Sequence, residues 1–413
     1  MAAAAPHRVG EPSPLILHLG AALSAYGSAL LAAPRADSPD FPWVEALGVD
    51  RAALADIDRI ELASEVAARL GATVRGLEIW QRHPYRRTLA DPPAIWEAGC
   101  SRLLDYGRTP EATRPDGPPV LFVPSLINRA YILDLAPGRS LLRGLAAQGF
   151  RPLLMDWGTP GPLEAGFDLA AYGEQRLRPA LARATEIAGR PVPVAGYCMG
   201  GTLAVGLAAT APEAVAALVT IGAPWDFGPV QGLAGGYRAS IRANGLARAE
   251  ALLDAQAQAF GMVPVPLFQF LFALVNPLQA ALKFQKLARL DPAGAAARLF
   301  VALEDWLADG VPMPLGAARD LLLRWPIENA PATGGWRFLG RTVDPARATA
   351  PALLFCGAGD SIAPPALALP LGRALPRAEV VTARTGHVGM IVGSAARSEV
   401  WRPLAGFLST HGG

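Results

Sequence analysis

The chain has 413 residues, 52% of them hydrophobic and 17% charged, so it can bury a large core and does not have the composition of a disordered protein. Its 37 basic and 35 acidic residues nearly balance, and it contains no basic run or nucleic-acid motif, which argues against a nucleic-acid-binding protein. The three cysteines are widely spaced and the five histidines form no cluster with metal-ligand spacing, so we expect neither a disulfide framework nor a metal centre, and the cysteine usage fits a reducing compartment such as the cytoplasm.

Residues 1–115 are expected to form an N-terminal helical region without a clear run of strands. Its first apolar segment, 15–33, carries no charged side chain and is long enough to raise the question of a membrane span. Its polar residues and glycines favour a packing helix; a segment that lies on a lipid or polymer surface, or a weak signal peptide, is the alternative. Residues 50–79 have the periodicity of one or two amphipathic helices, and the Pro/Gly-rich stretch 108–119 predicts a linker or turn.

The rest of the chain, residues 116–413, is predicted to be one α/β domain. Its strands are expected at the short apolar runs 119–124, 151–157, 192–198, 216–224, 350–360 and 378–383. Helical patterns between several of these runs predict a mostly parallel, doubly wound sheet. From about 228 to 340 the alternation stops, which predicts a helical insertion of the kind that forms a lid. Its apolar side chains suit a greasy substrate or an ordinary packing surface equally well.

The strongest local pattern is the sequence GYCMGG, which runs from Gly196 to Gly201 between a predicted strand and a predicted helix. This is the nucleophile-elbow pattern, with Cys198 where a hydrolase usually has serine. Because the turn is tight, the residues two before and two after the nucleophile must be small, and Gly196 and Gly200 meet this need. The N-terminus of the helix would favour the thiolate of Cys198. The alternative is a structural cysteine between chance glycines.

A nucleophile at an elbow needs an acid and then a histidine later in the chain. His387 lies directly after the last predicted strand, whereas the other four histidines precede the sheet or end the chain. Asp360 directly follows the preceding predicted strand and would accept a hydrogen bond from His387. Asp134 and Asp156, on earlier loops, fit structural or substrate-side roles better. The alternative for His387 is an exposed loop histidine.

The oxyanion hole of such a site uses two backbone amides. One would be the amide of Met199, which follows the nucleophile. The other would come from the loop after the first strand of the apolar series, where we favour Leu126, and Pro124 is excluded because it has no N–H. The remaining cysteines, Cys100 and Cys356, are expected to be structural.

Several of these strings together resemble the polyhydroxyalkanoate synthase family of the α/β-hydrolase superfamily, and most closely its short, two-subunit type. Residues 121–161, which contain LINRAYILDL and end in MDWGTPG, are similar to the long signature after the family's first core strand. GYCMGGT is similar to its lipase-like box with cysteine. GDSIAPP and TGHVGMIVGSAA resemble its acid and histidine segments.

The resemblance implies an α/β-hydrolase fold with a helical lid insertion, and an acyltransferase that polymerises 3-hydroxyacyl-CoA. Cys198 would form an acyl-cysteine with release of CoA, His387 would act as base, and Asp360 would orient His387. No cofactor is implied, because the CoA thioester is a substrate. The implied partners are the polyester chain or granule surface, a second synthase subunit and a further copy of the chain in a homo-oligomer. The implied location is the cytoplasm, at the polyester granule surface. The chain departs from the short type in its N-terminal helical region, and the lid matches only in pieces.

Two other functions stay open at this point. A hydrolase (a polyester depolymerase, an esterase or a thioesterase) would use the same three residues with water as acceptor, because transfer and hydrolysis differ only in whether water reaches the acyl-enzyme. A granule-associated scaffold without turnover would be expected to have lost a residue of the triad, and none is lost.

Overall fold

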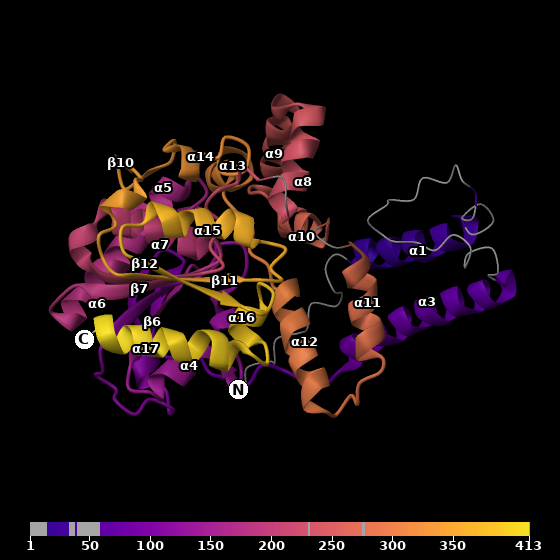
Figure 1. Ribbon diagram of the computed structural model, residues 1–413, viewed down its shortest axis with the longest axis horizontal. Helices are drawn as coiled ribbons and strands as arrows, with labels where there is room; N and C mark the ends of the chain where they lie inside the picture. The colour runs from indigo at the N-terminus through magenta and orange to yellow at the C-terminus, as the bar shows by residue number, and fades with distance from the viewer. Residues whose placement is uncertain (1–14, 33–37, 39–57, 230–231, 275–276, 413) are drawn as a thin grey trace. The chain divides into compact units, whose positions relative to one another are not determined.

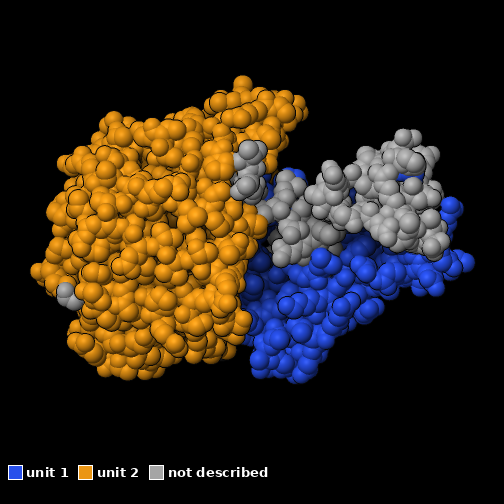
Figure 2. Space-filling model, viewed as in Figure 1, with its two compact units in different colours: residues 1–86, 269–308 blue, residues 87–268, 309–413 orange. Residues whose placement is uncertain are grey.

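The computed structural model divides into two compact units (Figure 2). Unit 1 comprises residues 1–86 and 269–308, and unit 2 comprises residues 87–268 and 309–413. The residues that the structure describes are 15–32, 38, 58–229, 232–274 and 277–412.

Unit 2 is built around an eight-stranded sheet in the order β1-β2-β6-β3-β7-β8-β11-β12 (Figure 1). Its strands are β1 (Ala94–Ala98), β2 (Ser101–Asp105), β3 (Pro119–Val123), β6 (Arg151–Asp156), β7 (Val192–Tyr197), β8 (Val215–Ile221), β11 (Ala352–Gly357) and β12 (Ala378–Ala383). All neighbours from β6 to β12 pair in parallel. Strands β3, β7 and β11 are buried at every residue, which is why they read as continuous apolar runs. The predicted mostly parallel sheet is confirmed.

The sheet begins earlier in the chain than the expected boundary at residue 116. Strands β1 and β2 lie within the region for which no strands were expected, and both are antiparallel. Strand β1 is the edge strand and is only partly buried, and charged residues such as Glu97 and Arg102 interrupt the apolar pattern of the pair. A search for continuous apolar runs therefore misses them.

Helices cover both faces of the sheet (Figure 1). Helices α4 (Leu141–Ala146) and α17 (Arg402–His411) lie on one face. Helices α6 (Arg178–Ala188), α7 (Met199–Thr210) and α15 (Pro365–Ala374) lie on the other. Helix α7 packs on the central strands β3, β7 and β8 and is buried along its whole length. Its Ala- and Gly-rich sequence allows this close approach, since it has few bulky side chains.

Residues 228–340 are mainly helical where they are described. In unit 2 they form α8 (Gly232–Asn244), α9 (Leu246–Phe260), α13 (Leu315–Arg319) and α14 (Ala330–Thr333), and α10 (Val265–Leu274) runs into the part assigned to unit 1. The chain then returns through the small hairpin β9 (Arg337–Phe338) and β10 (Arg341–Thr342). A buried aromatic cluster holds this return: Trp336 lies 5.2 Å from Trp325 and 5.3 Å from Phe338 between ring centroids.

In the described part of unit 1 the helices are α1 (Leu15–Ala32), α3 (Arg59–Arg82), α11 (Pro277–Leu287) and α12 (Ala295–Ala308), together with the end of α10. Ala22 and Tyr26 of α1 are buried against Val66 of α3, and Tyr26 Oη lies 2.6 Å from Gln285 Nε2. This packing supports the interpretation of segment 15–33 as a packing helix; Ala33 itself and residues 50–57 lie outside the described residues. Among the described helices, none combines the length and apolar character that a membrane crossing needs.

Candidate active site

Cys198 stands on a sharp turn between β7 and α7. Its backbone has φ 57° and ψ −132°, a conformation that residues other than glycine rarely adopt. A Cβ on Gly196 would lie 2.3 Å from the carbonyl oxygen of Gly200, and a Cβ on Gly200 would lie 2.1 Å from that of Val123. Both positions therefore exclude any side chain, as the elbow pattern predicts.

The Cys198 thiol is half-buried, so a substrate can reach it. Its backbone N–H donates to the carbonyl oxygen of Ile221 on the neighbouring strand (2.9 Å), and its own carbonyl oxygen accepts from Gly201 (2.8 Å). Because α7 begins at the next residue, the positive end of the helix dipole lies beside Cys198.

His387 and Asp360 form a buried pair. Their side chains meet at 2.6 Å between His387 Nδ1 and Asp360 Oδ2. The other carboxylate oxygen, Oδ1, accepts hydrogen bonds from the backbone amides of Ile362 and Ala363, both at 2.8 Å. Since both oxygens are held, the carboxylate can fix the tautomer and the orientation of the imidazole.

The second ring nitrogen of His387, Nε2, faces the nucleophile. It is buried, and no described residue forms a hydrogen bond of ordinary geometry with it. Burial lowers the pKa of His387, but the charge of Cys198 and hydrogen bonding to Asp360 and Cys198 outweigh burial and raise the pKa to about 10. The two groups are therefore adjacent without a well-formed hydrogen bond, which is common for catalytic pairs before substrate binds.

Two neighbours that the sequence analysis did not single out hold the imidazole in place. The ring of Tyr197 lies 5.2 Å from the His387 ring between centroids, tilted by 33°. Gly222, at the end of β8, has φ +60°, and a Cβ there would come within 3.0 Å of His387 Cε1. Gly222 directly follows a buried strand, and this is the sequence feature from which its contact with His387 could have been predicted.

The loop after β3 lies against the elbow. Pro124 O is 2.5 Å from the position that a Cβ on Gly200 would take. Within this loop the amide of Ile127 donates to Ser125 Oγ at 3.2 Å and is thus occupied. Leu126 and Met199 are both buried, at 6% and 1% exposed. The backbone amides of Leu126 and Met199 stay a prediction for the oxyanion hole.

The four segments that meet here follow the carboxyl ends of the parallel strands β3, β7, β11 and β12, the usual place of a site in a doubly wound fold. The family model for the alpha/beta hydrolase fold matches residues 118–394, which span all four. The chain belongs to the alpha/beta hydrolase fold family.

Curated relatives of this α/β hydrolase are polymerase subunits. A poly(3-hydroxyalkanoate) polymerase subunit PhaC from Haloferax mediterranei is 31% identical over 74% of this chain and 61% of its own length. Subunits of the same name from Synechocystis and Haloarcula marismortui are 29% and 25% identical, over 75% and 90% of this chain and 82% and 77% of their own lengths. The chain thus spans about three fifths of the Haloferax relative. The expected similarity to polyhydroxyalkanoate synthases is confirmed.

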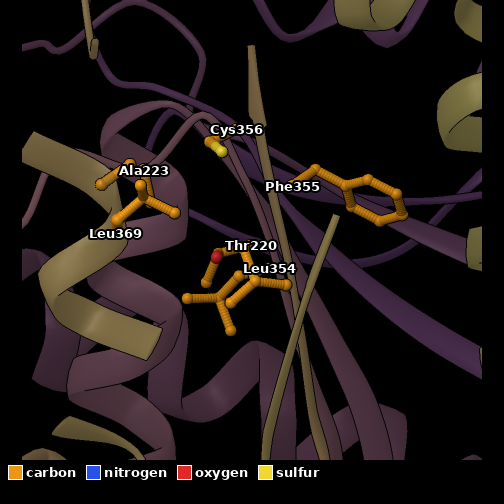
Figure 3. Close-up of a pocket in the computed structure, with 8 residues that line it drawn as sticks. Thr220, Ala223, Leu354, Phe355, Cys356 and Leu369 are labelled. Atoms are coloured by element: carbon orange, nitrogen blue, oxygen red, sulfur yellow. The ribbon is translucent and has the colours of Figure 1, made fainter. Parts of the chain in front are cut away.

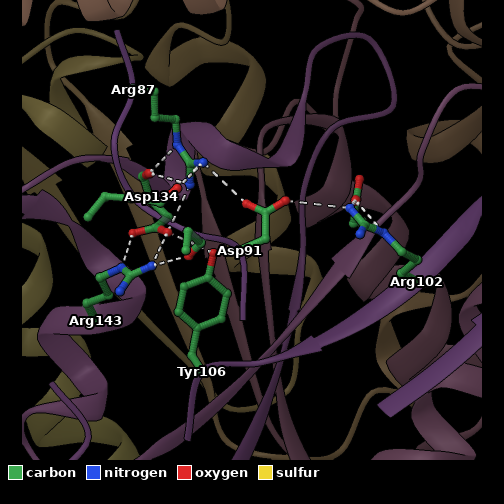
Figure 4. A network of polar contacts seen from close by, with 9 residues as sticks. Arg87, Asp91, Arg102, Tyr106, Asp134 and Arg143 are labelled. Atoms are coloured by element: carbon green, nitrogen blue, oxygen red, sulfur yellow. Dashed lines mark hydrogen bonds and ion pairs between the residues drawn. The ribbon is translucent and has the colours of Figure 1, made fainter. Parts of the chain in front are cut away.

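Asp134 and Asp156 hold other parts of the fold, and Figure 4 shows Asp134 among its partners. Asp134 is fully buried and accepts hydrogen bonds from Arg143 Nε (2.8 Å), Arg87 Nη2 (3.1 Å) and Tyr106 Oη (3.1 Å). Asp156 pairs with Arg102 at 2.6 Å. Both contacts are structural, which is one of the two roles, structural or substrate-side, that the sequence analysis left open.

The remaining candidates of the α/β hydrolase also lie apart from the Cys198–His387–Asp360 group. Cys356 is buried in β11, where its sulfur lies 3.3 Å from Thr382 Oγ1 and borders a small recess beside Ala223 and Leu369 (Figure 3). His83 is buried in unit 1 with Nε2 2.7 Å from Pro292 O. Among the residues that the structure describes, no three His, Cys, Asp or Glu side chains are grouped so that they could hold a metal ion.

Proposed function

We propose that this protein of the α/β-hydrolase fold is an acyltransferase that polymerises 3-hydroxyacyl-CoA into a polyester. The observation that carries the proposal is the grouping of Cys198, His387 and Asp360 in a chain similar to PhaC polymerase subunits. The elbow supplies a half-buried nucleophile, and the buried histidine–carboxylate pair supplies a proton acceptor beside it.

In the first half-reaction, the Cys198 thiolate attacks the thioester carbon of the substrate, and its proton resides on His387. The carbonyl oxygen becomes an oxyanion, which would accept hydrogen bonds from the amides of Leu126 and Met199. The bond between the carbonyl carbon and the CoA sulfur then breaks. His387 returns the proton to the CoA thiolate, which leaves, and the acyl group stays on Cys198.

In the second half-reaction, the 3-hydroxyl of another acyl unit gives its proton to His387. Its oxygen attacks the acyl-cysteine, a new ester bond forms, and the carbon–sulfur bond to Cys198 breaks. Thioester exchange between two thiols is nearly isoenergetic, so a cysteine accepts the acyl group from CoA and keeps it reactive toward an alcohol. The scheme uses no cofactor, since CoA enters as part of the substrate and leaves as a free thiol.

We also propose the partners that such a reaction implies. The names of the relatives, each a polymerase subunit, support a second synthase subunit in the active assembly. The resemblance to short synthases supports a homo-oligomer. Helix α1 leaves Leu23 and Leu31 59% and 83% exposed, which supports contact with an apolar surface such as a polyester granule in the cytoplasm.

The proposal is tested with purified protein and 3-hydroxybutyryl-CoA. We expect CoA release, followed with a thiol reagent, together with polymer recovered from the mixture. Free 3-hydroxybutyrate in place of polymer would instead identify a hydrolase. No CoA release from protein whose Cys198 still reacts with iodoacetamide would point to a missing subunit or to a scaffold.

Cys198→Ala is expected to abolish CoA release, because the acyl-enzyme cannot form without the sulfur. The matched control is Cys356→Ser, which also removes a thiol but keeps a hydroxyl beside Thr382. This control should retain most of the activity. Release of CoA by Cys198→Ala at an appreciable fraction of the unsubstituted rate would refute the assigned nucleophile.

A further inference from the structure

Trp157, directly after β6, is bound to the loop that carries Leu126. Its indole Nε1 donates a hydrogen bond to the carbonyl oxygen of Pro124 at 3.1 Å. The bond is buried, with Trp157 only 5% exposed. A buried carbonyl that loses its donor is costly, so this bond restrains the peptide between Pro124 and Ser125.

The same carbonyl lies against the nucleophile elbow. Pro124 O would be 2.5 Å from a Cβ on Gly200, so there is no room for the loop to move toward α7. The Leu126 amide follows one residue after the restrained peptide. Its direction therefore depends on how the Pro124 carbonyl is held.

Trp157 is itself held on two sides. Its carbonyl oxygen accepts hydrogen bonds from Ser101 Oγ and Cys100 Sγ, both at 3.1 Å. Burial and the charge of Glu164 raise the pKa of Cys100, which keeps this thiol protonated and able to donate. The indole ring meets Tyr172 edge-on, with centroids 5.7 Å apart.

We propose that Trp157 is a positioning residue for the oxyanion hole: through Pro124 it aims the Leu126 amide at the acyl oxygen. The inference rests on the acyl-transfer function proposed above, but it concerns a residue that touches neither substrate nor triad. A merely structural tryptophan would affect every reaction of Cys198 alike. A positioning residue for the oxyanion hole would affect only reactions that create an oxyanion.

Two reactions of Cys198 separate these roles. Acylation by a thioester or ester passes through a tetrahedral intermediate and needs the oxyanion hole. Alkylation by iodoacetamide is a displacement at a saturated carbon, which needs the thiolate but develops no oxyanion. The ratio of the two rates reports on the oxyanion hole and is insensitive to the fraction of folded protein.

The main variant is Trp157→Phe, which keeps an aromatic ring and removes the N–H donor. We expect the acylation rate to fall about 10- to 100-fold, since small displacements of a catalytic donor have effects of this order. The alkylation rate should stay within about 2-fold of the unsubstituted protein, because Cys198 and His387 are left in place.

The control is Trp336→Phe. Trp336 is also 5% exposed, but it packs on Gly206 in the middle of α7 and not on the oxyanion loop. It should lower neither rate by more than about 2-fold once the folded fraction is matched. If Trp157→Phe does not fold, Ser101→Ala tests the same chain of contacts more gently and should show the same split between the rates.

Acylation is measured with 3-hydroxybutyryl-CoA and, separately, with p-nitrophenyl butyrate as the burst of p-nitrophenol. Acylation by p-nitrophenyl butyrate needs the oxyanion hole but not the proposed CoA substrate. If only the proposed function is wrong, this ester therefore still tests the role of Trp157. Unchanged acylation in Trp157→Phe, or a parallel fall of acylation and alkylation, would overturn the inference.

Discussion

Cys198 combines a strained backbone with a charged neighbour. The elbow exposes its sulfur, while His387 beside it is held by Asp360, whose two oxygens are both occupied. The imidazole pKa is raised even though burial opposes its protonation, because negative charge at Cys198 and the hydrogen bond to Asp360 favour the charged ring. At the scale of single residues the site thus places the sulfur of Cys198 beside an imidazole whose pKa is raised.

The rate of Cys198 alkylation should depend weakly on pH. With the pKa of His387 raised to about 10, the ring is protonated below that value and loses its charge only as the pH rises through it. A charged imidazole favours negative charge on the neighbouring sulfur, so we expect the iodoacetamide rate to rise less steeply between pH 7 and 9 than that of an ordinary thiol. An isolated thiol with a pKa of about 8.5 gains roughly ten-fold or more over this range.

The control for this pH profile is His387→Gln, which removes the charge and keeps a polar side chain. Its alkylation rate should be low at pH 7 and should rise with pH as for an ordinary thiol. Identical steep profiles for the two proteins would show that His387 does not act on the sulfur.

Gly200→Ala should disable the elbow. Its new methyl group would meet Val123 O at 2.1 Å and Pro124 O at 2.5 Å, and backbone atoms cannot give way as a flexible side chain can. We expect a loss of about 1–3 kcal/mol or more in the free energy of unfolding and little residual acylation. Gly406→Ala, in α17 with open space around it, should instead stabilise the protein by about 0.5–1 kcal/mol. Urea unfolding checks both, and a tolerated Gly200→Ala would contradict the elbow geometry.

At the scale of elements, the segment from Ala130 to Ser140 connects the loop after β3, which carries Leu126, to other parts of unit 2. After the loop the chain forms the 3₁₀ turn η4 (Ala130–Leu133) and the hairpin of β4 (Asp134–Ala136) and β5 (Arg139–Ser140). Asp134 ties this hairpin to Arg87, to Tyr106 after β2 and to Arg143 of α4 (Figure 4). Arg139 donates to the carbonyl oxygens of Val392 and Gly393, at the end of the short helix that follows His387. The hairpin therefore links the two sides of the site.

Asp134→Ala should be strongly destabilising. The carboxylate is fully buried, and its removal leaves the guanidinium of Arg143 nearly buried without its main partner. Breaking such a pair costs roughly 3–5 kcal/mol, which chemical denaturation would measure. Asp116→Ala is the matched control, because this aspartate also pairs with an arginine but is 77% exposed. It should cost less than about 1 kcal/mol, and equal costs would contradict a special role for the buried network.

At the scale of the whole molecule, chemistry and helical packing belong to different parts of the chain. Unit 2 contains the sheet, the Cys198–His387–Asp360 group and the loop after β3 that carries Leu126. Unit 1 contains the N-terminal helices and residues 269–308, which come from the middle of the chain. The expected insertion at 228–340 is thus divided between the units. The similarity to the Haloarcula subunit covers 90% of this chain and so extends beyond unit 2.

The fold and the grouping of Cys198, His387 and Asp360 could be predicted from local sequence. Buried parallel strands appear as unbroken apolar runs, and β12 begins and ends at the predicted residues, Ala378 and Ala383. The elbow glycines are visible because a tight turn restricts residue type at fixed spacing. His387 and Asp360 follow from the order of strands, since each comes directly after one. Strands β1 and β2 were missed for two reasons: β1 is an edge strand that is only partly buried, and charged residues such as Arg102 interrupt the apolar run of β2.

Contacts between segments far apart in the chain were decided by tertiary structure alone. No local sequence pattern indicates that Trp157 donates a hydrogen bond to Pro124 or that Gly222 lies against the His387 ring. The same holds for the ion pairs that Asp134 forms with two arginines. The sequence by itself determined which strands precede Cys198, Asp360 and His387, because backbone conformation and burial restrict residue type position by position. Side-chain partners across the sheet were settled only on folding, because many residues of suitable type are present and packing selects which of them meet.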